Sequence, residues 1–346
     1  MKYFNVAGPC NREKHYMINA SNRLQGVEEL IDSEQYFVIH AARQSGKTTY
    51  LKNLVQQLND EGKYYALYCS LERVQNIIEP EKGVPAIVHS LTTYLRYSKL
   101  PHINEFALNA DTPHTEILFT SLVDYCMLLD KPLVIFFDEA DCLSENTLIS
   151  FLRQLRSGYN DRSTMPFVHS VALVGMRNLR DYKAKIRPDS ETLGSASPFN
   201  VIKKALTIKN FTKDEIIQLY SQHTAETGQI FNGDAVELVW EQTQGQPWLV
   251  NAIACEVIAE ILQSDYTQPI TPELVSQAIQ NIILERPTHI DSLLERLNEK
   301  RVRKIISPMI MGKDINNTKS DDFLYTRDLG LIREVDLQII PANPIY

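Results

Sequence analysis

Residues 41–48 have the composition of a loop that binds phosphate. They are Ala41, Ala42, Arg43, Gln44, Ser45, Gly46, Lys47 and Thr48, which fit the pattern G-x-x-x-x-G-K-[ST] with alanine in the first glycine position. In such a phosphate loop the main-chain N–H groups surround the β-phosphate, and the second glycine lets the backbone approach. We expect Lys47 to reach the β- and γ-phosphate oxygens and Thr48 to hold Mg²⁺. Thr49 completes the predicted nucleotide-binding set.

Two adjacent carboxylates supply the second part of the expected chemistry. Asp138 and Glu139 follow the apolar run 133–137, roughly ninety residues after the phosphate loop. Phosphoryl transfer needs groups that arrange a metal ion and the attacking water. We expect Asp138 to position Mg²⁺ through its water shell and Glu139 to act as the general base. Two alternatives stay open: a lysine-capped turn in place of the phosphate loop, and an acidic pair that only caps the following helix.

The elements that must position these groups alternate in type over the first 210 residues. The continuous apolar run 133–137 is typical of a parallel strand covered on both faces. The alternation of strands and helices predicts a wound α/β sheet. Strands are predicted at 36–40, 64–70, 133–137, 167–174 and 201–208, and helices at 48–59, 84–98 and 146–156.

The pattern becomes helical after residue 210. Thr212 followed by Glu215 is a capping-box pair that opens a helix running to about residue 227. Further helices are predicted at 233–243, at 248–263 and from Pro272, and together they form a helical lid. The last part, with helices at 301–311 and 321–329 and a strand pair at 331–340, predicts a small winged helix.

Taken together, these motifs resemble the AAA-like P-loop ATPases, and especially the branch of archaeal-type ATPases, origin-recognition-like proteins and STAND signalling ATPases. The resemblance covers nearly the whole chain. It implies an α/β P-loop NTPase core with a wound parallel sheet at 1–210, a helical lid at 211–290 and a winged-helix-like domain at 291–346. It also implies ATP and Mg²⁺ as cofactors.

The resemblance extends to residues outside the two main motifs. The stretch 171–178 looks like the family's sensor-1 strand, which implies contact of Asn178 or Arg177 with the γ-phosphate or the water. Asn178 matches the origin-recognition pattern and Arg177 the signalling one. Pro247 lies in a GxP motif that in this branch packs against the nucleotide, although Pro247 also rigidly starts a helix. No arginine stands at the usual sensor-2 position beside that helix.

Weaker signals concern three further regions. Residues 16–24, with Arg23, lie where related proteins cover the adenine, but the apolar side chains there also suit a core. Arg162 is a candidate for reaching the nucleotide of a neighbouring subunit. The basic residues in 300–304 could touch nucleic-acid phosphates or form a solvated face, and the aspartates in 321–328 oppose DNA binding.

Composition limits the classes of partner. The 346 residues include 35 Lys and Arg against 43 Asp and Glu, a net charge of −8, which disfavours nucleic acid as a partner of the whole molecule. No stretch approaches the roughly 18 apolar residues of a membrane span, and no signal peptide opens the chain. We therefore expect a cytoplasmic protein without a membrane partner. The five cysteines have no disulfide or metal-ligand spacing.

These observations favour a slow, Mg²⁺-dependent ATPase. Its ATP and ADP forms would differ in the position of lid and winged helix, so that hydrolysis times a switch. Self-association remains open. The alternatives are an ATPase whose winged helix binds duplex nucleic acid, a signalling scaffold that holds nucleotide without hydrolysing it, and, more remotely, a small-molecule kinase.

Overall fold

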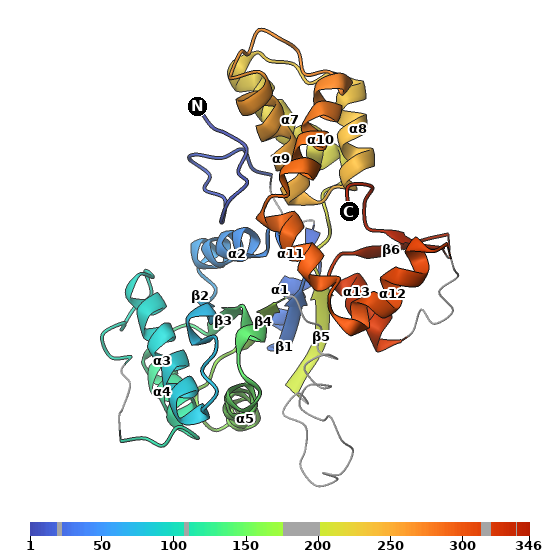
Figure 1. The fold of residues 1–346 in the computed structure, drawn as a ribbon. Helices are drawn as coiled ribbons and strands as arrows, with labels where there is room; N and C mark the ends of the chain where they lie inside the picture. The colour runs from blue at the N-terminus through green and yellow to red at the C-terminus, as the bar shows by residue number, and fades with distance from the viewer. Residues whose placement is uncertain (19–22, 107–110, 176–200, 313–319, 337) are drawn as a thin grey trace. The chain divides into compact units, whose positions relative to one another are not determined.

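The fold contains a five-stranded parallel sheet (Figure 1). One of its strands precedes the phosphate loop in the chain, and another ends at Asp138. The computed structural model describes residues 1–18, 23–106, 111–175, 201–312, 320–336 and 338–346. Every neighbouring pair of strands in this sheet is parallel, and the spatial order is β2-β3-β4-β1-β5. The predicted wound α/β sheet is thus confirmed. The strands are β1 (Tyr36–His40), β2 (Tyr65–Ser70), β3 (Leu133–Asp138), β4 (Ser170–Gly175) and β5 (Ile202–Thr207).

The chain forms two compact units, and each is described by itself. Unit 2 comprises residues 25–40 and 50–207, and it contains the whole sheet. Unit 1 comprises residues 1–24, 41–49 and 208–346, so it contains the phosphate loop and all helices after the sheet. The predicted division at residues 210 and 290 stays a prediction.

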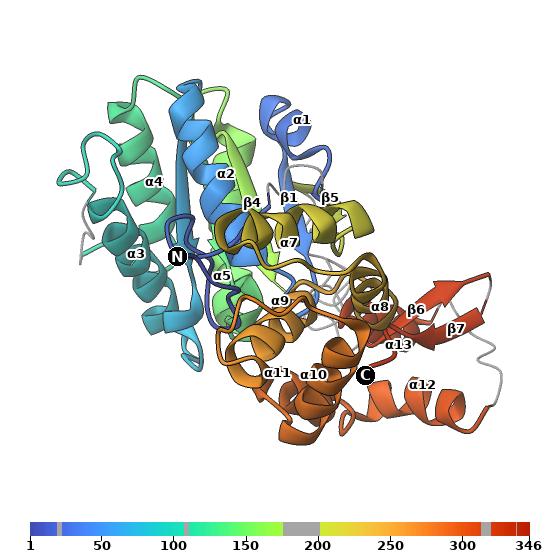
Figure 2. The same ribbon diagram turned by 90° about the horizontal axis from the view of Figure 1, so that it is seen from above.

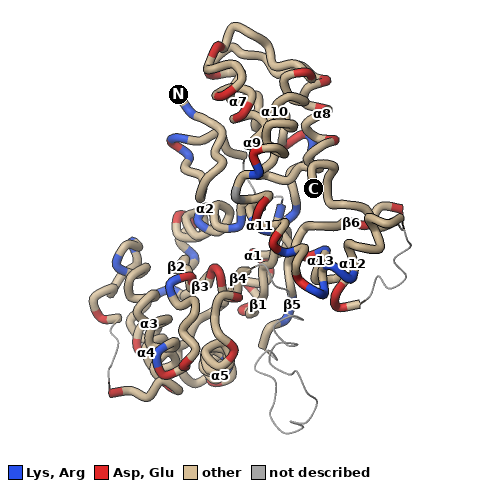
Figure 3. The backbone as a smooth tube through the Cα atoms, viewed as in Figure 1, with Lys and Arg blue, Asp and Glu red and all other residues tan. Residues whose placement is uncertain are grey.

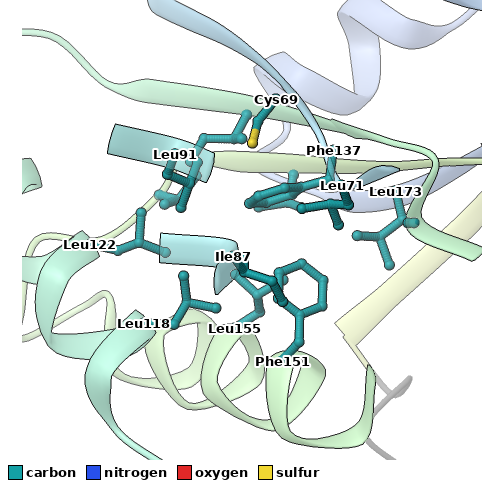
Figure 4. Close-up of a cluster of buried hydrophobic side chains, with 14 of the residues drawn as sticks. Cys69, Leu71, Ile87, Leu91, Leu118, Leu122, Phe137, Phe151, Leu155 and Leu173 are labelled. Carbon is teal, nitrogen blue, oxygen red and sulfur yellow. The ribbon is translucent and has the colours of Figure 1, made fainter. Parts of the chain in front are cut away.

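The core of unit 2 lies between the sheet and three helices. These are α3 (Pro80–Arg96), α4 (Ile117–Leu128) and α5 (Glu145–Asp161), while α1 (Val27–Asp32) contacts β1 and α2 (Lys47–Glu61) follows the phosphate loop. Figure 4 shows how side chains from strands and helices meet in this core. Burying these apolar surfaces holds the sheet rigid behind the loops at its carboxyl edge. Contributors are Cys69, Phe137 and Leu173 from the strands and Ile87, Leu91, Leu118, Leu122, Phe151 and Leu155 from the helices.

Unit 1 has a helical core joined by the N-terminal segment. The helices of the predicted lid are α7 (Lys213–Thr227), α8 (Gly233–Thr243), α9 (Pro247–Cys255), which continues into a π-helical stretch (Glu256–Ile261), and α10 (Pro272–Glu285). Thr212 and Glu215 form the predicted capping box at the start of α7. Phe4 and Tyr16 of the N-terminal segment are buried in the same cluster as α7, and the Tyr16 hydroxyl donates to Glu226 Oε2 at 2.8 Å.

The C-terminal elements of unit 1 build a separate small core. They are α11 (Thr288–Arg296), α12 (Lys300–Ile310), α13 (Asp321–Asp328) and the antiparallel pair β6 (Ile332–Val335) and β7 (Gln338–Pro341). Figure 2 shows the hairpin beside α13, with α12 next to it. Val302, Ile306 and Phe323 pack together in this core. Helix, helix and hairpin therefore follow one another as the sequence predicts.

Within the described residues, three helices are absent from the sequence-based prediction. They are α1, α4 and α11, and the helix predicted at 84–98 begins earlier, at Pro80. The strand predicted at 167–174 begins only at Ser170, because Phe167 and Val168 enter the core without joining the ladder. Among the helices of the described ranges, none has both the length and the apolar character that crossing a membrane requires.

Candidate functional site

The phosphate loop connects β1 directly to α2. β1 ends at His40 and α2 begins at Lys47, so the loop occupies the strand-to-helix turn that its chemistry requires. Gln44 and Gly46 have φ angles of 56° and 83°, and left-handed residues of this kind are typical of turns whose successive main-chain N–H groups bind anions. Ala41 is 1% exposed and does not adopt a positive φ, so its methyl group is tolerated where the pattern has glycine.

Lys47 turns back into its own loop. Its side chain is buried, and Nζ donates to the main-chain oxygens of Ala41 at 3.2 Å and Ala42 at 3.4 Å. These carbonyl groups partly compensate the burial of an ammonium ion. The arrangement keeps one positive charge inside the loop, where it can pair with phosphate oxygens.

Two side-chain oxygens of the loop are buried without a hydrogen-bond partner. They are Gln44 Oε1 and Ser45 Oγ, and Ser45 is 2% exposed. An unpaired buried polar atom is costly, and such atoms concentrate where a ligand supplies the missing partner. Thr49 differs, since its Oγ1 accepts from the Cys10 N–H at 3.0 Å. The loop therefore suits a polar ligand with both acceptor and donor groups, as a hydrated phosphate chain has.

Arg23 holds the phosphate loop from the N-terminal side. The side chain is buried, and Nη2 donates to the Ser45 carbonyl at 2.8 Å while Nε donates to the Lys209 carbonyl at 2.8 Å. The guanidinium lies 4.7 Å from the centre of the Phe211 ring. One arginine thus fixes the loop to the chain segment that leads into the lid.

The start of α9 approaches the phosphate loop from the lid. Gln246 caps α9 by accepting from the Leu249 N–H at 2.6 Å, and its Nε2 donates to the Gln44 carbonyl at 3.5 Å. Pro247 is the first residue of α9 and is buried. Gly245 has φ 70°, and a Cβ there would lie 1.9 Å from the Phe211 carbonyl oxygen. The contact of Pro247 with nucleotide stays a prediction.

A histidine of α11 lies near the exposed Arg43. His289 is buried, its ring centre is 4.8 Å from that of Trp248, and Nε2 lies 2.5 Å from the Tyr346 hydroxyl oxygen. Burial, together with the nearby charge of Arg43, lowers the pKa of His289 to about 4. The histidine is therefore neutral at pH 7 and adds no charge beside the phosphate loop.

Asp138 and Glu139 occupy the carboxyl end of β3 in unit 2. Asp138 is 1% exposed, its Oδ1 accepts from the Glu139 N–H at 3.0 Å and its Oδ2 accepts from the Tyr68 hydroxyl at 2.9 Å. Glu139 has φ 56°, and this left-handed conformation is unusual for a residue with a Cβ. A strained residue at a strand end is a common feature of functional sites.

Within unit 2, strands β1 and β3 end at the same edge of the sheet. His40, the residue before the phosphate loop, ends β1, and Asp138 ends β3; both strands flank β4. The carboxyl ends of parallel strands lie at the same edge, which is where α/β proteins bind ligands. The His40 ring is buried there, with Nε2 3.1 Å from Thr207 Oγ1 at the end of β5.

Three further arginine and asparagine residues were predicted to act at the nucleotide. Arg177 and Asn178 lie outside the described residues, directly after the end of β4 at Gly175. Arg162 caps α5, donates to the Glu34 carbonyl at 2.7 Å and lies over the Tyr159 ring at 4.0 Å, so it is engaged within its own unit.

Two residues of the basic face predicted on α12 form ion pairs within the chain. Arg301 Nε and Lys304 Nζ lie 3.6 Å and 2.9 Å from the carboxylate of Asp322 on α13, and Arg301 also covers the Tyr325 ring at 3.7 Å. Figure 3 shows basic residues on α12 and both acidic and basic residues on α13. The single carboxylate of Asp322 therefore offsets part of the positive charge of this face.

Comparison with known proteins identifies the family and the fold. The family model described as an AAA-like domain matches residues 8–346. The chain belongs to this AAA-like domain family. Among solved structures, the Walker-type ATPase PABY2304 of Pyrococcus abyssi is 16% identical in sequence and superposes with a TM-score of 0.64. The alignment covers 99% of this chain and 97% of the P. abyssi chain. A comparison with curated proteins finds no match.

Two further solved structures are more distant. The ORC1 protein of Aeropyrum pernix, solved in complex with DNA, has 14% identity, covers 91% of this chain and 80% of its own, and has a TM-score of 0.47. The RuvB Holliday junction branch migration motor of Thermotoga maritima has 12% identity, coverage of 91% and 88%, and a TM-score of 0.44. At these identities, similarity to the P. abyssi ATPase concerns the fold alone.

Sequence reasoning missed two residues at these motifs. No role was predicted for Gln246, the middle residue of the GxP motif, or for Tyr68 in the strand predicted at 64–70. Their contacts join residues 202 and 70 positions apart, so no local pattern reveals them. Alternation along β2 offered one signal, because it predicts that Tyr68 and Ser70 share a face.

Proposed function

We propose that this AAA-like protein binds ATP with Mg²⁺, hydrolyses it slowly, and uses the nucleotide state to control its lid. The observation that carries the proposal is the phosphate loop itself. It combines the buried Lys47, a left-handed turn at Gln44 and the unpartnered Ser45 hydroxyl between a strand and a helix. A simple lysine-capped turn explains the lysine contacts, but it gives no reason to bury two unpaired oxygens.

Within this proposal each half of the site has a defined task. The main-chain N–H groups of the phosphate loop and Lys47 bind the β- and γ-phosphates, while Thr48 and Asp138 would hold Mg²⁺, which neutralises phosphate charge when bound. Glu139 orients the attacking water and accepts its proton. The shared sheet edge of β1 and β3 supports assigning both motifs to the same nucleotide.

The lid is the proposed output of the nucleotide state. Gln246 touches the Gln44 carbonyl, and a Cβ on Gly330, which follows α13, would lie 2.6 Å from the Cβ of Ala42. A change in the backbone of the phosphate loop therefore affects α9 and the segment before β6. We infer that the C-terminal elements form a winged helix that responds to the same change.

Binding of duplex nucleic acid is the weaker alternative. Two of the cations of α12 that would touch phosphates, Arg301 and Lys304, are paired with Asp322, and releasing them costs the ion pairs already made. A nucleotide-bound scaffold without turnover retains the same loop and differs only in the role of Glu139. The rate of phosphate release separates that scaffold from the ATPase.

Calorimetric titration with ATP and Mg²⁺ tests the central proposal. We expect saturable binding to the wild-type protein and a loss of at least tenfold in affinity for Lys47→Ala, because the main charge facing the phosphates is removed. Lys203→Ala, at an exposed position on β5, is the matched control and should bind as the wild type does. Absence of binding to the wild-type protein would overturn the proposed function.

A further inference from the structure

Tyr68 reaches the carboxylate of Asp138 because of the register between β2 and β3. Ser70 pairs with Asp138 in the parallel ladder, and Tyr68 lies two residues earlier on β2, on the same face. The phenol is long enough to extend along the strand direction, and its hydroxyl donates to Asp138 Oδ2 at 2.9 Å. The nearer Ser70 hydroxyl instead accepts from the Glu72 N–H at 3.3 Å.

The Tyr68 ring is held in place by neighbours from two helices. The Tyr94 ring of α3 packs edge-on against it with 5.5 Å between ring centres. Nζ of Lys52 on α2 lies 5.4 Å from the ring centre. A ring fixed in this way loses little conformational freedom when its hydroxyl donates, so the hydrogen bond can define an orientation.

Each oxygen of the Asp138 carboxylate accepts a hydrogen bond. The Glu139 N–H approaches Oδ1 and the Tyr68 hydroxyl approaches Oδ2. A carboxylate has roughly four acceptor sites, so occupying one on each oxygen determines where the others point. Asp138 is 1% exposed, and bulk water cannot perform this task.

We propose that Tyr68 is a positioning residue, which orients Asp138 toward the magnesium ion and its water shell. This inference rests on the proposed function of the site. Donors that orient metal-binding carboxylates typically contribute ten- to hundredfold to metal affinity or activity. Tyr68 acts through Asp138 and is not itself assigned to the reacting atoms.

The chain contains a matched control on the same strand. Tyr65, at the start of β2, donates through its hydroxyl to Asp130 Oδ1 at 2.8 Å, at an exposed position. Tyr65→Phe and Tyr68→Phe each remove one hydroxyl that donates to an aspartate. Only the second involves Asp138, and retaining the ring keeps its packing against Tyr94.

The test measures affinity for a fluorescent ATP analogue by anisotropy at increasing Mg²⁺ and also in EDTA. For Tyr68→Phe we expect about a tenfold higher Mg²⁺ concentration at half-effect, with unchanged affinity in EDTA. Mn²⁺, which binds oxygen and nitrogen ligands more tightly, should reduce the difference. Tyr65→Phe should match the wild type. Circular dichroism of both variants checks that the fold is retained.

Three outcomes would overturn the inference. The first is a Mg²⁺ dependence of Tyr68→Phe equal to that of the wild type. The second is an equal shift in Tyr65→Phe, which would indicate a general effect on β2. The third is weaker binding in EDTA with no change in Mg²⁺ dependence, because Tyr68 would then act on the nucleotide and not through Asp138. A wild-type protein that binds no nucleotide would instead refute the proposed function.

Discussion

Arg23 donates a hydrogen bond of 2.8 Å to the main-chain oxygen of Ser45, in the middle of the phosphate loop. The same guanidinium binds the Lys209 carbonyl and covers the Phe211 ring, so one side chain joins the loop to the entrance of the lid. Because Arg23 is buried, this link is shielded from competing water. A rigid loop needs little reorganisation when it binds phosphate.

Arg23→Ala is expected to weaken both the fold and nucleotide binding. Two hydrogen bonds from a charged group are lost and two carbonyl groups lose a partner, so the free energy of unfolding should fall by roughly 2–4 kcal/mol. Thermal unfolding and ATP titration measure the two effects. Arg153→Ala, at an exposed position of α5, serves as control and should change neither. Unchanged ATP affinity in Arg23→Ala would show that the link does not organise the loop.

Glu139→Gln separates binding from hydrolysis. The substitution keeps the size of the side chain and removes the proton acceptor, so ATP affinity should persist while phosphate release falls at least a hundredfold. A phosphate-release assay beside the calorimetric titration measures both. Glu72→Gln, at an exposed position, is the control. Equal turnover in Glu139→Gln would refute the general-base role.

Glu139→Gly tests the strain at the same position. A φ of 56° is unstrained for glycine, so the substitution relieves strain in the folded state. Glycine also gives the unfolded chain more conformational freedom, which opposes this gain. The free energy of unfolding should therefore stay within about 1 kcal/mol of wild type. Phosphate release should nevertheless be lost. A strong loss of stability, measured by denaturant unfolding, would contradict the idea that this backbone conformation is kept for function.

The sequence predicts elements well where local physics determines them. The apolar run that becomes β3 and the capping box at Thr212 need no distant partner to be recognised. Helix α4 is different, because its residues 117–128 are apolar on several sides and lack a clear polar face. A buried helix of that kind has no 3.6-residue alternation, and it was missed for this reason.

Contacts between distant residues were beyond prediction. The phosphate loop was evident from residue types, but the bond between Gln246 and Gln44 depends on how the lid chain returns to the loop. The Tyr68–Asp138 hydrogen bond depends on the register of the parallel strands β2 and β3. A shift of one residue in this register would place the two side chains on opposite faces of the sheet. Neither the path of the lid chain nor the register of the two strands can be predicted from a local sequence pattern.

Gly245→Ala should destabilise the lid. Its φ is 70°, and a Cβ would lie 1.9 Å from the Phe211 carbonyl oxygen, so the backbone of either residue must move. We expect a loss of roughly 2–4 kcal/mol in the free energy of unfolding. The control is Gly233→Ala at the start of α8, where a Cβ meets no atom within 4 Å and alanine favours the helix. Thermal unfolding of both variants distinguishes strain from a general effect of added methyl groups.

His289 gives the protein a stability that decreases in acid. Burial and the charge of Arg43 lower the pKa of His289 from 6.5 to about 4 in the folded state, so between these values the unfolded chain binds one more proton. The contribution is complete above pH 6.5 and is lost as the pH falls toward 4, amounting to about 3 kcal/mol in total.

The variant His289→Asn isolates this contribution from those of other histidines. Denaturant unfolding at pH 7.5, 6, 5 and 4.5 should show that the wild type loses stability more steeply than the variant, by up to about 1.4 kcal/mol per pH unit. His89→Asn replaces an exposed histidine of α3 and should follow the wild type. Parallel curves for His289→Asn and wild type would mean that His289 protonates equally in both states. The ring would then be accessible to water, and the contact with Tyr346 would not exclude solvent from it.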